Sequence, residues 1–110
     1  MKTIEKGWGR EFWIINCDKY CGKILELNGG YSSSYHYHTL KQETFYCLEG
    51  ELILNLEGTD IPMSGGDEPV TVYPAQLHSF RSVVGAKVLE VSTEHSDEDV
   101  VRQDRSHKLD

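Results

Sequence analysis

Hydrophobic and polar residues alternate along most of this chain, in short runs separated by turn residues. Successive side chains of a β-strand point to opposite faces, so such runs predict strands with one buried face. We expect strands near residues 11–16, 22–28, 31–38, 43–48, 51–57, 69–73, 77–84 and 87–93. No segment has the hydrophobic repeat of a convincing amphipathic helix. The pattern therefore predicts an all-β fold, either a sandwich or a barrel.

Glycine-containing pairs and clusters separate these runs and predict the turns. They are Gly29-Gly30, Glu49-Gly50, Glu57-Gly58, Ser64-Gly65-Gly66-Asp67 and Val84-Gly85. The segment 44–57 is interpreted as a β-hairpin with its leucines on one face. We expect one domain over residues 1–110, with a core of about 8–95. The polar tail 96–110 is charged and poor in apolar residues, so it either drapes over the fold or frays.

Two histidines lie on one face of a predicted strand. His36 and His38 are two residues apart, which places them on the same side about 6–7 Å apart at Cα. Glu43 can return to that side after a turn, with Phe45 and Cys47 behind it lining the floor of a pocket. The same parity puts Val88, Glu90 and Ser92 on one face of the 87–93 strand.

His78 can complete a set of four ligands with His36, His38 and Glu43. Three neutral imidazoles and a carboxylate suit manganese, iron, cobalt, nickel or zinc. A metal that prefers six ligands would keep positions open for water or substrate. We therefore predict a divalent transition-metal site.

Charge and cysteine content limit the partners that the chain can bind and indicate its cellular compartment. Eleven basic and 18 acidic residues give a net charge of −7, which argues against nucleic acid or an anionic membrane as partner. We find no signal-peptide pattern and no apolar run long enough to span a membrane. Cys17, Cys21 and Cys47 are odd in number and lack the spacing of a disulfide framework. A reducing cytoplasm fits best.

The spacing of Gly30, His36, His38, Glu43 and Gly50 resembles the first motif of the cupin superfamily, G-x5-H-x-H-x(3,4)-E-x6-G. Every marked position is met. The stretch from Gly66 to Ser82, with Pro74 and His78, is a weaker match to the second motif. It lacks the glycine after the proline, and Ser82 stands where the motif has asparagine. The resemblance implies a single-domain cupin jelly-roll β-barrel.

A closer resemblance, over about residues 12–107, is to the D-lyxose isomerases and related cupin sugar isomerases. It is carried by the segments 16–23, 41–45, 90–93 and 97–99, and Trp8-Gly9 with Glu11 is similar to the opening of cupin-type mannose-phosphate isomerases. The resemblance implies aldose–ketose chemistry and a divalent metal, most often manganese. By position, the metal ligands fall on His36, His38, Glu43 and His78, the active-site lysine on Lys41 and the catalytic glutamate on Glu90.

Aldose–ketose isomerisation by proton transfer needs a base at C2 and stabilisation of the enediolate that forms. A divalent ion stabilises that negative charge as a Lewis acid. Glu90 is the natural base, because a partly desolvated carboxylate can have its pKa raised toward the working pH. Lys41 could protonate or hydrogen-bond the sugar oxygen. We state this mechanism as a hypothesis.

Several of these residues could instead have a purely structural role. Some cupins have lost their metal and keep the histidines as polar core. Lys41 and Glu90 could simply face solvent. Arg81 could meet a substrate anion or be an exposed strand charge. His95 lies in the polar region beyond the last predicted strand, where nothing is seen to converge on it.

Three functions compete. The first is a metal-dependent sugar isomerase or epimerase. The second is a non-catalytic cupin that binds carbohydrate or another small ligand. The third is a small iron dioxygenase or lyase. A free sugar is favoured over a sugar phosphate, because no basic residues other than Lys41 and Arg81 are evident near the motif. A homodimer is expected, with the apolar run Phe12–Ile15 as the candidate contact.

Overall fold

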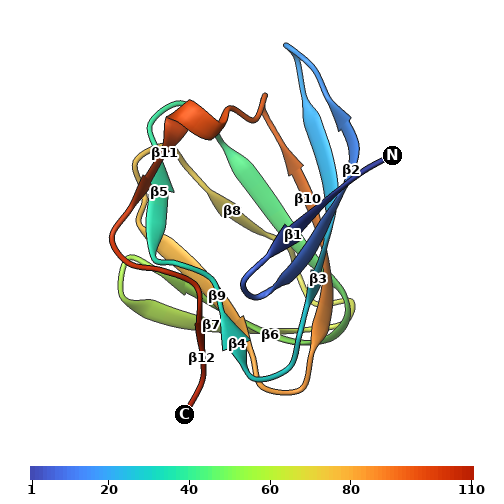
Figure 1. Ribbon diagram of the computed structural model, residues 1–110, viewed down its shortest axis with the longest axis vertical. Helices are drawn as coiled ribbons and strands as arrows, with labels where there is room; N and C mark the ends of the chain where they lie inside the picture. Colours follow the sequence, from blue (N-terminus) through green and yellow to red (C-terminus); the bar gives the residue numbers. More distant parts are fainter.

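The computed structural model describes residues 1–110 as twelve β-strands and one 3-10 helix. Figure 1 shows the strands arranged in two layers that curl around a common interior. The strands are β1 Lys2–Lys6, β2 Gly9–Asn16, β3 Cys21–Leu27, β4 Tyr31–Ser32, β5 His36–His38, β6 Glu43–Leu56, β7 Thr59–Ser64, β8 Val70–Val72, β9 His78–Ser82, β10 Ala86–Ser92, β11 Val100–Arg102 and β12 His107–Lys108. The 3-10 helix η1 covers Asp97–Asp99. The predicted all-β class is confirmed.

The two layers share the long strand β6. Its first half pairs with β10 and β8, and β10 continues through β3 and β2 to β1. Its second half pairs with β7 and β9, and β9 continues to β4 and β5. All of these pairs are antiparallel. This is the arrangement of a jelly roll, in which one sheet folds over the other.

The predicted hairpin over residues 44–57 is wrong, because β6 runs unbroken from Glu43 to Leu56. The Glu49-Gly50 signal marks a bend instead of a reversal. Gly50 has a φ of 82°, a left-handed conformation that bends the strand where it leaves one sheet for the other. The hairpin lies one step later, where the Glu57-Gly58 turn joins β6 to β7.

The ends of the chain supply strands that the alternation of residues did not predict. The segment from residue 96 onward drapes over the fold: β11 pairs with β5 and β12 pairs with β4. At the other end, β1 pairs with β2. The predicted strand 31–38 is interrupted after Ser32, because Ser33 leaves strand pairing to exchange hydrogen bonds with Phe80 of β9. No helix of the structure has the length and apolarity to cross a lipid bilayer.

The core lies between the two layers and is built by strict alternation. In β3 every second residue is buried, and the buried positions include Leu25 and Leu27. Trp8 packs edge-on against Phe80, with ring centroids 4.9 Å apart. Each fully buried side chain of this size contributes about 1.5–3 kcal/mol through the hydrophobic effect. One end of the interior, by contrast, holds polar and charged side chains, and that end is the candidate site.

Replacement of Gly50 by alanine is expected to destabilise the fold strongly. A Cβ at this position would lie 2.2 Å from the carbonyl oxygen of Gly85, in addition to the strain of a positive φ. Gly58 offers a matched control, because its φ is 89° but a Cβ there meets nothing within 4 Å. Gly58→Ala should cost about 1–2 kcal/mol of unfolding free energy and Gly50→Ala clearly more, as measured by urea denaturation. Equal losses would contradict this account of the bend.

Candidate functional site

Three histidines meet because β5 and β9 are neighbours. His36 is the direct antiparallel partner of His78, so the two side chains share a face, and His38 follows two residues later on the same side of β5. The ring centroids of His36 and His78 are 4.5 Å apart, and those of His38 and His78 are 5.8 Å apart. Ring nitrogens of all three lie within 4.8 Å of one another. The sequence-predicted histidines therefore come together.

Hydrogen bonds orient two of these imidazoles. Nδ1 of His36 lies 2.8 Å from the carbonyl oxygen of Ser34, and Nδ1 of His78 lies 2.9 Å from that of Gln76. A carbonyl oxygen only accepts, so each Nδ1 carries the proton and each Nε2 keeps a lone pair. Burial lowers the pKa of His36 to about 3 and that of His38 to about 4. Both imidazoles are therefore neutral near pH 7, the form that binds a metal.

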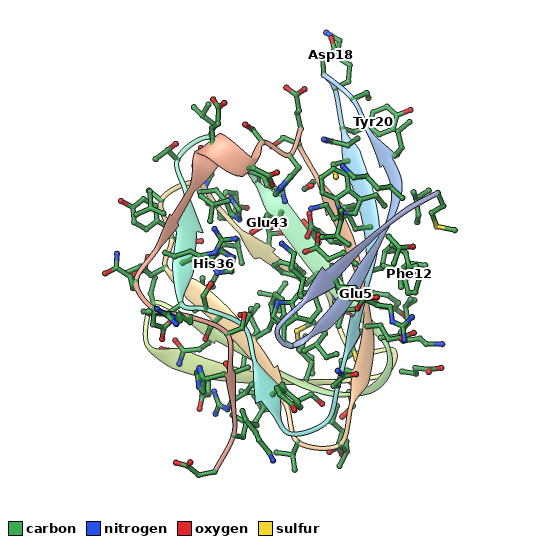
Figure 2. The ribbon with its side chains drawn as sticks, in the orientation of Figure 1. Glu5, Phe12, Asp18, Tyr20, His36 and Glu43 are labelled. Atoms are coloured by element: carbon green, nitrogen blue, oxygen red, sulfur yellow. The ribbon has the colours of Figure 1, made fainter.

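Glu43, the first residue of β6, brings a carboxylate to the same point. Its Oε2 is 3.0 Å from Nε2 of His78 and 3.5 Å from Nε2 of His38. Figure 2 shows Glu43 and His36 within the interior enclosed by the strands. Oε2 of Glu43 and Nε2 of His78 are buried, yet neither forms a hydrogen bond. Buried polar atoms without partners are costly, and a cation bound between them would satisfy both. The donor set therefore fits a divalent metal.

Lys41 joins this histidine–carboxylate group to Glu90. Its side chain is 2% exposed, and Nζ lies 2.7 Å from Oε2 of Glu90 and 3.2 Å from Oε1 of Glu43. Burial alone would lower the pKa of Lys41, but the two carboxylates outweigh it and raise that pKa above its usual value. Burial would likewise raise the pKa of Glu43, but the adjacent Lys41 cation holds it well below its usual range. The lysine is a buried cation between two anions, so Lys41 and Glu90 do not face solvent.

His95 also belongs to this cluster, although neither cupin motif includes it. Its Nδ1 lies 3.1 Å from Nζ of Lys41, and its Nε2 lies 2.8 Å from Oδ1 of Asp97. Burial and the nearby Lys23 and Lys41 charges lower the pKa of His95. A neutral ring protonated on Nε2 accepts from the lysine and donates to the aspartate. No sequence pattern signalled this contact, because 54 residues separate His95 from Lys41.

The connection between β5 and β6 is held by Asp99 of η1. Its carboxylate accepts hydrogen bonds from the backbone N–H groups of Thr39, Leu40 and Lys41, and from the Thr39 hydroxyl. These groups follow His38 and precede Glu43 directly. One member of the acidic run 97–99 therefore fixes the loop between two candidate ligands.

The pocket above these groups is open at one end and mostly polar. Of the 19 residues that line it, only 5 are hydrophobic. Phe45 lines it as predicted, but Cys47 lies in the apolar core instead. Arg81 does not reach the pocket. It pairs with Asp60 at 2.8 Å, which makes it a strand charge on the outside. The polar lining favours a ligand rich in hydroxyl or charged groups.

Replacement of Asp99 by asparagine should loosen the loop between the candidate ligands. The amide keeps one acceptor oxygen but loses the charge that binds three N–H groups. We expect a loss of about 2–4 kcal/mol in unfolding free energy and weaker binding of a divalent metal by calorimetry. Glu98→Gln is the control, because this exposed neighbour forms no side-chain hydrogen bond. Metal affinity equal in both variants would argue against a role for Asp99 in positioning the site.

Known proteins with similar sequences include two enzymes. A D-lyxose/D-mannose isomerase from Thermosediminibacter oceani is 28% identical over 111 residues, with 77% of this chain and 61% of the relative covered. A quercetin 2,3-dioxygenase from Bacillus subtilis is 41% identical over 46 residues, which is 42% of this chain and 13% of the relative. The chain thus spans less than two thirds of the length of either relative.

Structural comparison supports the same fold. A cupin described as RmlC-like, from Shewanella frigidimarina, superposes with a TM-score of 0.77 at 17% identity, covering 88% of this chain and 86% of that one. This likeness bears on the fold alone. The family model for the cupin domain matches residues 23–92, which is more than half of the chain and contains all four predicted ligands, Lys41 and Glu90. With its jelly-roll fold and its histidine group between the sheets, the chain belongs to the cupin family.

Proposed function

We propose that this chain is a metal-dependent sugar isomerase that interconverts an aldose and a ketose, as the D-lyxose/D-mannose isomerase it resembles does by name. The observation that carries the proposal is Lys41, a buried cation that joins a candidate metal-binding carboxylate, Glu43, to a second carboxylate, Glu90. A site that only stored a metal would have no use for a second buried acid–base pair beside the donor set.

In this proposal His36, His38, His78 and Glu43 hold a divalent metal, with manganese the first candidate and iron, zinc, nickel and cobalt the others. The neutral imidazoles with lone pairs on Nε2 and the buried, unpartnered Oε2 of Glu43 support this assignment. When bound, the metal supplies Lewis-acid stabilisation of negative charge on the substrate oxygens.

Glu90 and Lys41 divide the proton chemistry between them. Oε2 of Glu90 faces Lys41 and Ser92, which leaves Oε1 to take the proton from C2 of the sugar and return it to C1. Lys41 stays protonated because the carboxylates raise its pKa, so it acts as a hydrogen-bond donor and not as a base. His95 accepts a hydrogen bond from the lysine and keeps Nζ directed toward this end of the pocket.

The iron dioxygenase alternative has one observation in its favour, the similarity over 46 residues to quercetin 2,3-dioxygenase. Charged residues line the pocket here, which suits a polyhydroxylated sugar better than a large aromatic substrate. Oxygen uptake with the iron-loaded protein would favour the dioxygenase. Tight sugar binding without exchange of aldose and ketose would favour the non-catalytic binding protein.

Replacement of Glu90 by glutamine tests the isomerase directly. We expect the variant to keep its metal, measured by elemental analysis, because Glu90 is not among the proposed ligands. The aldose–ketose rate should fall by about 10²–10⁴-fold, the usual contribution of a general base. In D₂O the wild type should also incorporate deuterium at the carbon that is reprotonated, as proton transfer requires.

Two controls separate catalysis from folding in this experiment. Glu94→Gln changes an exposed glutamate four residues away and should leave the rate unchanged. Glu90→Asp keeps the negative charge beside Lys41 but withdraws it by one methylene. Its unfolding free energy should therefore be close to that of the wild type, while its aldose–ketose rate should still fall. Retained metal with an unchanged rate in Glu90→Gln would remove this residue from the mechanism.

We also propose that two copies associate through the outer face of the sheet that contains β2, β3, β10 and β6. Phe12, Ile24, Leu89 and Tyr46 are direct cross-strand neighbours and form an apolar row on that face. Figure 2 shows Phe12 on the outside. The run Phe12–Ile15 does not act as a unit, because Trp13 turns inward to Glu11 and His95.

The three free cysteines support a reducing, cytoplasmic setting.

Light scattering tests this association. The wild type should have twice the chain mass of 12.5 kDa at micromolar concentration, and Leu89→Lys should have the mass of a single chain. Val84→Lys changes an exposed residue outside the row and should leave the dimer intact. A wild-type mass of 12.5 kDa at every concentration would refute the proposed dimer.

A further inference from the structure

A second set of basic residues surrounds the open end of the pocket, away from Lys41. Arg102 of β11 is the direct antiparallel partner of His36, so its side chain leaves the sheet on the same face as that imidazole. It lines the pocket and is exposed. An exposed lining residue lies where the pocket meets solvent, so this guanidinium is at the entrance to the site.

Lys6 comes to the same entrance from the other end of the chain. It is the last residue of β1 and also lines the pocket. The turn that follows it touches the C-terminal segment, because a Cβ on Gly7 would lie 2.9 Å from Cβ of Ser106. Figure 1 shows the β1–β2 hairpin in front of the interior, between β3 and the C-terminal segment. Lys6 and Arg102 therefore belong to the two terminal segments that meet over the pocket.

Neither of these two cations has a partner. Lys6 and Arg102 form no ion pair within 4.0 Å and no side-chain hydrogen bond, as is also true of Arg105 and Lys108 outside the pocket. The other pocket lysines are engaged: Lys41 by its two carboxylates, and Lys23 by Glu11 at 3.6 Å and by the face of Trp13 at 4.3 Å. The free positive charge of the pocket is thus concentrated at its entrance.

The charge balance of the pocket differs from that of the chain. Four basic and four acidic residues line it, so its walls are neutral although the chain carries −7. A bound divalent metal would make it positive. Two cations without an ion-pair partner at one pocket favour an anionic ligand there.

We propose that the substrate is an anionic sugar whose phosphate or carboxylate group is bound by Arg102 and Lys6 at the pocket entrance, while its reacting carbons lie beside Glu90. The substrate class rests on the proposed isomerase function, but the anion site does not. The guanidinium offers a planar pair of donors that matches either anion. This reverses the expectation of a neutral sugar, which took only Lys41 and Arg81 into account.

Steady-state kinetics on matched aldoses test the proposal. A neutral aldose, its terminal phosphate ester and the corresponding uronic acid are compared with the wild type, Arg102→Gln, Lys6→Gln and the control Arg105→Gln, an exposed arginine outside the pocket. We expect the wild type to prefer one anionic sugar, and Arg102→Gln to raise its KM about 10- to 100-fold with little change in kcat. The KM for the neutral aldose should be the same in Arg102→Gln and in Lys6→Gln as in the wild type. Preference for the ester or for the acid identifies the anion.

A binding measurement keeps this test independent of turnover. Inorganic phosphate is titrated into the metal-free full-length protein and followed by NMR, with the backbone signals of residues 6 and 102 expected to shift in the wild type and Arg105→Gln but not in Arg102→Gln. If no sugar is isomerised and this phosphate response is seen, the anion site stands and the isomerase proposal fails. If neutral and anionic sugars react alike, or if phosphate binds equally well without Arg102, the anion site is wrong.

Discussion

The interaction on which the site depends is the burial of one lysine between two glutamates. Lys41 is almost fully enclosed, and so are Glu43 and Glu90. Any one of these charges alone would be strongly unfavourable in this interior, and loss of one partner from such a group usually costs about 3–5 kcal/mol. The fold must therefore assemble all three together. Because Glu43 also faces His38 and His78, the same requirement fixes the imidazoles, the carboxylates and the lysine as one unit.

Local sequence rules account for the parts of this unit that lie on single strands. Alternation placed His36 with His38, and Glu43 with Phe45, on the interior face, and it grouped Glu90 with Val88 and Ser92 on one face of β10. The structure has all of them there. These predictions hold because a two-residue repeat is a property of the strand itself. The same reasoning failed at Gly50, where a glycine that can adopt a positive φ bends a strand within an otherwise regular alternation and does not reverse the chain.

The contacts that tie the strands together could not be predicted in this way. His95 meets Lys41, Asp99 binds the loop after His38, and Arg102 lies opposite His36, although each comes from a segment that is polar and lacks periodicity. A short polar strand gains its stability from the partner it pairs with, not from its own pattern. The contacts of the C-terminal segment can be understood only when the edge of β5 with which it pairs is known. Its acidic and basic residues are therefore visible in the sequence as composition, but their roles depend on tertiary structure.

The charge of the buried unit bears on both the proposed metal and the proposed anion. The formal charges of Glu43, Glu90 and Lys41 sum to −1, and the neutral His36 and His38 add nothing to it. A divalent cation held by the histidines and Glu43 would change this sum to +1. Proton transfer from C2 to Glu90 leaves this total unchanged, because Glu90 becomes neutral while the negative charge moves to the sugar oxygen, where the metal would stabilise it. A fixed anion on the sugar inside this group would compete with the developing charge for the same cation. In the proposed binding mode the anion is held by Arg102 and Lys6 instead, which line the pocket but are not part of the buried unit.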